Sequence, residues 1–124
     1  MTEIIDATII VNDGNQVTQS VMYFPVGNDI TVTVQYPNIS DGTGYQTEFY
    51  YKDDRTTPDD DPASIAYAVA LVADPVNVGA TMSTIQIPST DNDLPGAYWW
   101  RVDLLDPEDL RTTIGFGTLL VEAV

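Results

Sequence analysis

Apolar and polar residues alternate with a period of two along most of this chain, and that pattern constrains its fold more than any other feature. In the segment ITVTVQY at 30–36, every even-numbered residue is apolar or aromatic and every odd-numbered one is polar. Such alternation predicts a β-strand with one buried face. Asn28-Asp29 before the segment and Pro37-Asn38 after it are typical turn residues.

Seven other segments carry weaker versions of the same pattern. In segment 65–73 the alanines also permit a helix, but Tyr67, Val69 and Leu71 alternate, so we predict a strand. The turn-forming residues 12–15 favour a tight hairpin between the first two segments. Many short strands separated by Gly, Pro, Asp and Asn predict one sandwich or barrel domain over residues 1–124. The segments are 3–11, 17–24, 45–52, 65–73, 81–87, 97–105 and 112–121.

The aromatic run at 98–100 refines this prediction. Leu94, Gly96 and Tyr98 have the spacing of a tyrosine corner, in which a Tyr hydroxyl binds nearby backbone at the start of a strand. The corner indicates an immunoglobulin-like β-sandwich of about seven to nine short antiparallel strands. Alternation places Trp100 in the core and Trp99 on the opposite face with Arg101 and Asp103. We therefore expect Trp99 to be either covered by a loop or exposed as a contact residue beside Arg101.

The charge balance limits the possible partners. Nineteen acidic residues face only four basic ones, a net charge of −15. Such a surface repels phosphate backbones and anionic lipids, so we expect neither nucleic acid nor membrane as a partner. High solubility at high copy number and a salty environment both remain open as explanations. The N-terminus has no signal-peptide pattern and no apolar run long enough for a membrane span, so we expect a soluble protein.

Catalytic and metal-binding residues are scarce. The chain has no His and no Cys, which removes the commonest general base, the strongest common nucleophile and thiolate metal sites. Its single lysine, Lys52, stands beside two aspartates that favour the charged form. The acidic segment 52–62 and Asp91-Asn92-Asp93 suggest calcium, but consecutive aspartates with prolines among them fit a solvated loop better. We therefore predict a non-enzymatic protein without a cofactor or metal site.

Several stretches resemble a known group of proteins. They are PGAYWWRVDL at 95–104, RTTI at 111–114, GTLLV at 117–121 and VGNDITVTV at 26–34. Together they resemble immunoglobulin-like virion domains of tailed viruses, including the N-terminal domain of phage baseplate upper proteins. The match covers about half of the chain. The resemblance implies a sandwich fold with a structural role. Such relatives often continue into a further domain after the last strand, whereas this sequence stops at Val124, so we expect a free-standing accessory protein rather than a baseplate arm.

The sequence thus leaves two main kinds of function open, with a hydrolase that uses a pair of carboxylates as a third, disfavoured alternative. The first is a capsid decoration or cement subunit that binds the major capsid protein shell as a homo-oligomer, or a tail or baseplate accessory protein. It would dock through residues 1–24 or through the aromatic strand face. The second is a carbohydrate-binding or adhesion module that recognises a surface glycan, with Trp99, Tyr50 and Tyr45 as stacking platforms. In either role the candidate interface residues are Trp99, Arg101, Tyr50 and Tyr45.

Overall fold

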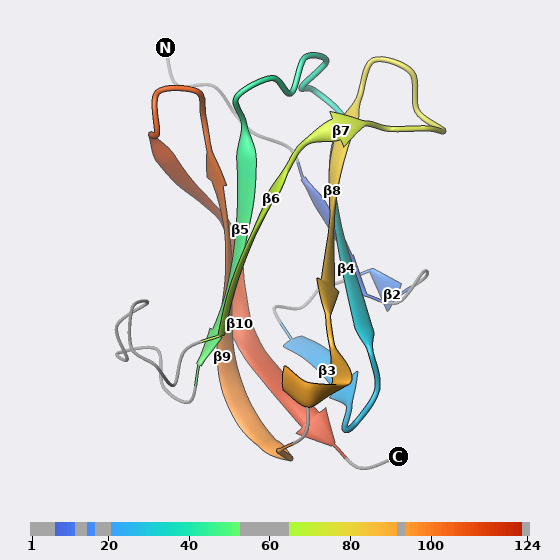
Figure 1. Cartoon of the computed structure of the whole chain (residues 1–124), viewed down its shortest axis with the longest axis vertical. Coiled ribbons are helices and arrows are strands. Elements are labelled where there is room, and N and C mark those ends of the chain that lie inside the picture. Colours follow the sequence, from blue (N-terminus) through green and yellow to red (C-terminus); the bar gives the residue numbers. More distant parts are fainter. Residues whose placement is uncertain (1–6, 12–14, 17–20, 53–64, 92–93, 123–124) are drawn as a thin grey trace.

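The computed structural model describes residues 7–11, 15–16, 21–52, 65–91 and 94–122. These residues form two five-stranded sheets packed face to face (Figure 1). β4 and β8 of the first sheet lie on the right of the view, and β5, β9 and β10 of the second lie on the left. The strands are β1 (Thr8–Val11), β2 (Asn15–Gln16), β3 (Val21–Pro25), β4 (Ile30–Tyr36), β5 (Gln46–Lys52), β6 (Ile65–Ala70), β7 (Val72–Ala73), β8 (Thr81–Ile87), β9 (Gly96–Leu105) and β10 (Arg111–Glu122), with a short 3-10 turn η1 (Ser89–Asp91).

The strand order confirms an immunoglobulin-like sandwich. The first sheet has the order β2-β1-β4-β8-β7 and the second the order β3-β10-β9-β5-β6. In the first sheet, β1-β4-β8-β7 corresponds to the order A-B-E-D of variable-type immunoglobulin domains. In the second sheet, β10-β9-β5-β6 corresponds to their order G-F-C-C′. Two of the ten described strands, β2 and β7, are only two residues long.

Segment 17–24 does not form the predicted hairpin partner of the first strand. β1 pairs with β2 over two residues, and the chain then crosses to the second sheet, where β3 runs parallel to β10. The prediction of antiparallel pairing is therefore wrong for this one strand. A parallel pair joins segments far apart in sequence, so local turn chemistry gives no signal for it.

Segment 65–73 is extended, as predicted, but it pairs with strands of both sheets. β6 is the edge strand beside β5, and after Leu71 the chain joins β8 as β7. β6 runs diagonally across one open side of the sandwich (Figure 1). This crossing closes that side of the core.

The core follows the predicted alternation. Along β4 the even-numbered residues are buried and the odd-numbered ones are partly exposed. Trp100 on β9 is 2% exposed and packs beside Gly115 on β10, where a Cβ atom would lie 3.1 Å from the indole. Gly115 therefore provides the space that this indole occupies.

One polar chain connects the two sheets through this core. The Tyr36 hydroxyl on β4 lies 2.7 Å from the Thr47 hydroxyl on β5, which lies 2.8 Å from the Ser83 hydroxyl on β8. Burial raises the pKa of Tyr36 to about 12, against the opposing hydrogen bond from Thr47. These mutual hydrogen bonds allow three hydroxyl groups to be buried between apolar layers.

Candidate functional site

Three of the four candidate interface residues, Tyr50, Trp99 and Arg101, lie on the outer face of the second sheet, the face turned away from the first sheet. Residues in register across neighbouring strands point to the same side, and Tyr50, Arg101 and Phe116 form one such row across β5, β9 and β10. Lys52 and Trp99 belong to the next row. The structure thus confirms that Trp99 and Arg101 share a face, and it places Tyr50 beside them.

A bulge in β10 completes this face. The register between β9 and β10 shifts between Thr113 and Gly115, so Ile114 is an extra residue. Before the bulge Arg111 and Thr113 lie on the outer face, and after it Phe116 does. The bulge therefore brings both the ion-pairing and the aromatic part of β10 to one side of the sheet.

Asp103 is the centre of the polar part of this face. It lies on the outer face with Trp99 and Arg101, as predicted, but its side chain is completely buried. Arg101 Nε lies 2.9 Å and Arg111 Nη1 2.8 Å from Asp103 Oδ2, while the Thr113 hydroxyl donates to Oδ1 at 2.8 Å. A carboxylate that accepts three hydrogen bonds and faces two guanidinium groups is well compensated for its lost hydration.

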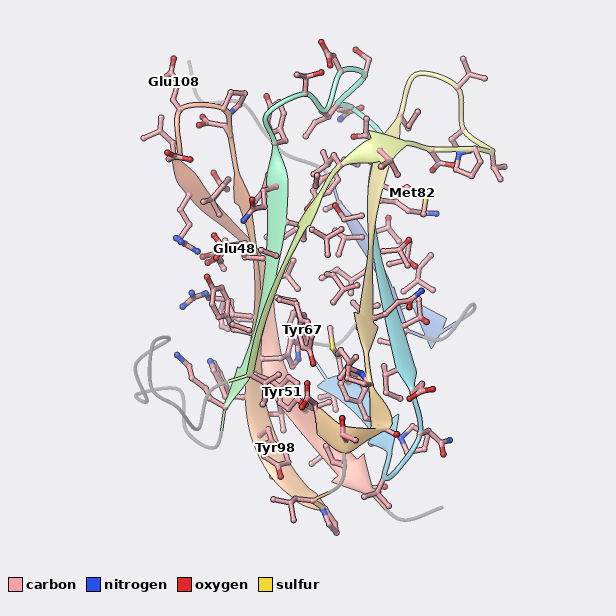
Figure 2. All side chains as sticks on the ribbon, in the orientation of Figure 1. Glu48, Tyr51, Tyr67, Met82, Tyr98 and Glu108 are labelled. Atoms are coloured by element: carbon pink, nitrogen blue, oxygen red, sulfur yellow. The ribbon has the colours of Figure 1, made fainter. Side chains whose placement is uncertain are left out.

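Glu48 and Tyr50 extend this network across β5 (Figure 2 labels Glu48). Arg111 Nη2 forms an ion pair with Glu48 at 3.2 Å, and the Tyr50 hydroxyl donates to the same carboxylate. The Arg101 guanidinium carbon lies 4.7 Å from the centre of the Tyr50 ring, within cation–π distance. Burial, assisted by Glu48, raises the pKa of Tyr50, and the hydrogen bond to Asp103 raises that of Arg111.

The other half of the face is aromatic. The Trp99 and Phe116 rings stack at 5.9 Å with a 39° tilt between their planes. Phe116 is 56% exposed and Tyr23 on the neighbouring β3 is 60% exposed. Tyr23 is in register with Leu120 of β10, and Thr118, opposite Trp99, lies between Leu120 and Phe116 on the same side of the sheet. We call this combined surface the aromatic–arginine face, formed by Tyr23, Tyr50, Trp99, Arg101, Arg111 and Phe116.

The charge of this face differs from that of the chain as a whole. Three of the four basic residues, Lys52, Arg101 and Arg111, lie on the outer face of the second sheet, and the fourth, Arg55, is outside the described residues. Over β5, β9 and β10, the acidic residues of this face are Glu48, Asp103 and, at the end of β10, Glu122. Three positive and three negative groups balance here, whereas the chain carries −15. Among the described residues, this is therefore a surface where an acidic protein can approach a partner with little repulsion.

Tyr45 does not belong to the aromatic–arginine face. It is partly buried and packs against the core between the sheets. Tyr50 is only 6% exposed, with Arg101 over its ring. Tyr45, Tyr50 and Trp99 therefore do not form one stacking platform for a sugar.

Sequence reasoning missed four residues of the site: Tyr23, Glu48, Arg111 and Phe116. The position of Arg111 could have been predicted from the sequence. The short acidic turn at 106–110 indicates a hairpin, and a hairpin places Arg111 opposite the end of β9. Tyr23 could not be placed, since it reaches this face only through the parallel β3–β10 pairing.

The predicted tyrosine corner is confirmed at the start of β9. The Tyr98 hydroxyl donates to the Leu94 carbonyl at 2.8 Å, and the Tyr98 ring meets Tyr51 edge-on at 5.9 Å. Tyr51 and Tyr67 donate to the backbone and the carboxylate of Asp91, respectively, and so fix η1 to the second sheet (Figure 2). The loop that leads into β9, the strand with Trp99 and Arg101, is thereby held at both ends.

The two calcium candidates fall largely outside the described residues, which exclude 53–62 and 92–93. Within the described part of the chain, no three acidic side chains form a group suited to a metal ion. Asp91 is instead a hydrogen-bond acceptor for Tyr67. The described residues also contain no helix that is long and apolar enough to cross a membrane.

Comparison with known proteins adds no relative to this geometry. No protein-family model and no curated protein sequence matches the chain.

Proposed function

We propose that this protein is a non-enzymatic structural subunit of a tailed-virus particle, a capsid decoration or cement protein that binds the major capsid protein shell. It docks through the aromatic–arginine face. The observation that carries this proposal is the concentration of exposed aromatic rings and arginines on one nearly neutral sheet face of a strongly acidic chain. The sequence resemblance to virion domains supports the choice of partner.

The composition of the face matches that of protein-binding hot spots. Trp, Tyr and Arg are enriched at such spots, and their energetic contribution depends on burial in a well-packed interface. Phe116 and Tyr23 are more than half exposed, so both have apolar area to lose to a partner. Trp99 supports Phe116 from the side. These rings lie on β-strands of a sheet, so they need little ordering when they bind.

The ion network favours a protein partner over a small charged ligand. Arg101 and Arg111 already bind Asp103, and Arg111 also binds Glu48. The network fixes both arginines to carboxylates of the same sheet and neutralises the area beside the aromatic rings. A nearly neutral area whose arginines already have carboxylate partners suits another folded protein better than a small anion.

A photo-cross-linking experiment tests the proposal in the cells that produce the protein. Phe116 is replaced by a benzophenone amino acid, and captured partners are identified by mass spectrometry. Leu110 is the matched control, since it is 62% exposed but lies in the turn at the end of the sandwich. We expect position 116 to capture a capsid shell protein and position 110 to capture much less of it.

Other outcomes would change the assignment. Capture of tail or baseplate proteins at position 116 would replace the shell with the tail as the location. Capture of no virion protein at all, or equal capture at positions 110 and 116, would refute docking through this face. The sugar-binding alternative receives no support from the separated positions of Tyr45 and Trp99.

A further inference from the structure

The four sheet edges of the sandwich are not equally protected. The first sheet ends in β2 and β7, which have two residues each. In the second sheet β3 ends in Pro25, which has no N–H group to donate. Short edge strands and edge prolines are common protections against pairing with another chain. Two of the four described edges are thus very short, and a third lacks one donor at its end.

β6 is the exception. It has six residues with no proline, glycine or charged side chain. Only β5 pairs with it among the described strands, so its other edge has unpaired backbone groups. The Ser83 hydroxyl lies 3.4 Å from the Val69 and Ala70 carbonyls, so the open part of the edge is its first four residues, 65–68.

The side chains along β6 also leave room for a neighbouring strand. Ile65, Tyr67 and Val69 are partly buried and pack against the core, whereas Ala66, Ala68 and Ala70 are exposed. The exposed side of the strand therefore presents only methyl groups, which allow a second backbone to approach. β6 itself carries no charge, and the two carboxylates beside it, Glu48 and Asp91, are already bound by Arg111 and Tyr67, respectively. The edge therefore presents no free charge that would select a charged partner segment.

We propose that the open edge of β6 pairs antiparallel with the same edge of a second copy of this chain. A strand edge that lacks charged and bulky outer side chains is complementary to itself, and antiparallel pairing obeys the two-fold symmetry of a homodimer. The net charge of −15 opposes contact over acidic parts of the surface, whereas β6 itself carries no charged side chain.

The pairing has a consequence for the proposed docking. The two-fold axis of an antiparallel pair is perpendicular to the sheet, so both second sheets join into one continuous sheet. The outer faces then lie on the same side, and the two aromatic–arginine faces are presented together. If the protein binds a capsid shell as proposed, the dimer would do so through two linked sites. Only this consequence rests on the proposed function. The pairing itself is independent of it.

The experiment compares the oligomeric state of the wild-type protein with two lysine variants by sedimentation velocity. The edge variant carries Ala66→Lys and Ala70→Lys, which face Tyr50 and Gln46 on β5 and not a basic residue. The control carries Val76→Lys and Val78→Lys at residues that are 81% and 104% exposed in a loop. Both variants change the net charge equally, so a general decrease in repulsion affects them alike.

We expect a wild-type dimer whose affinity increases with salt, because salt screens the repulsion between two acidic chains. The edge variant should dimerise at least about tenfold more weakly, since both copies then carry added positive charge on or directly beside the paired edge. The control should dimerise as well as the wild type. A wild-type chain that stays monomeric up to about 1 mM at high salt would refute the proposal.

Cysteine cross-linking provides a second measurement that does not depend on the lysine variants. The chain has no cysteine, so single cysteines placed in turn at 66, 68 and 70 can only link two copies. We expect one of them to form a disulfide-linked dimer rapidly on mild oxidation, and a cysteine at 78 to do so slowly. Equal rates at all four positions, or a dimer that is lost in Phe116→Ser and retained in the edge variant, would place the contact elsewhere.

Discussion

Replacing Asp103 with alanine should destabilise the protein by about 3 kcal/mol. The buried carboxylate accepts hydrogen bonds from Arg101, Arg111 and Thr113, all within 2.9 Å. Removal of one partner from a buried ion pair costs about 3–5 kcal/mol, because the remaining charge keeps its desolvation cost without compensation. The Arg101 and Arg111 side chains are 25% and 43% exposed, so water recovers part of that cost and the lower end applies.

Urea-induced unfolding followed by tryptophan fluorescence measures this change. Asp103→Asn keeps one acceptor oxygen and should lose about half as much stability as the alanine variant. For a chain of 124 residues, the alanine variant should also melt about 11 °C lower. Glu108→Ala is the matched control, because it removes the same charge from an exposed turn and should change stability by less than about 0.5 kcal/mol. Equal effects of the Asp103→Ala and Glu108→Ala substitutions would refute the idea that the network stabilises the face.

Three further predictions concern the core and its edges. Above pH 10 tyrosines of the unfolded chain lose their protons while folded Tyr36 keeps its own until about pH 12, so the free energy of unfolding should fall as pH rises through this window. In Tyr36→Phe, the decrease in unfolding free energy between pH 10 and pH 12, measured by urea unfolding, should be smaller by up to about 2 kcal/mol. An equal decrease in the wild type and the variant would show that Tyr36 does not cause it. Gly115→Ala should destabilise by about 1–3 kcal/mol in thermal melts, because its new methyl group would lie 3.0 Å from Ile9 and 3.1 Å from Trp100. Tyr98→Phe should cost about 1 kcal/mol by the same measurement; no change would mean that its hydroxyl bonds equally well to water.

Local features of the sequence predicted most of the fold. The alternation at 30–36 predicts the burial pattern of β4, because the face to which a side chain points depends only on the pleat of its own strand. The Tyr98 corner was also predictable, since its hydroxyl binds a carbonyl only four residues away. The shared face of Trp99 and Arg101 follows from the same short-range rule.

The features that the sequence did not predict depend on distant partners. Burial of Asp103 requires Arg111 and Thr113 from β10 and Glu48 and Tyr50 from β5 to enclose one area, which alternation within β9 cannot show. The change of sheet before β3 depends on a strand about a hundred residues later in the chain, which local propensity does not report.

The outer faces of the two sheets differ in composition. On the first sheet, the outward residues of β4 and β8 are mostly threonine and glutamine, a polar surface that is sufficient for a stable sheet. The second sheet has the same architecture, but its outer face contains a buried aspartate, stacked arginines and exposed aromatic rings. Burial of an aspartate and exposure of Phe116 and Tyr23 both cost free energy that a threonine surface would avoid. The concentration of these features on one face of the second sheet supports the proposed docking through the aromatic–arginine face.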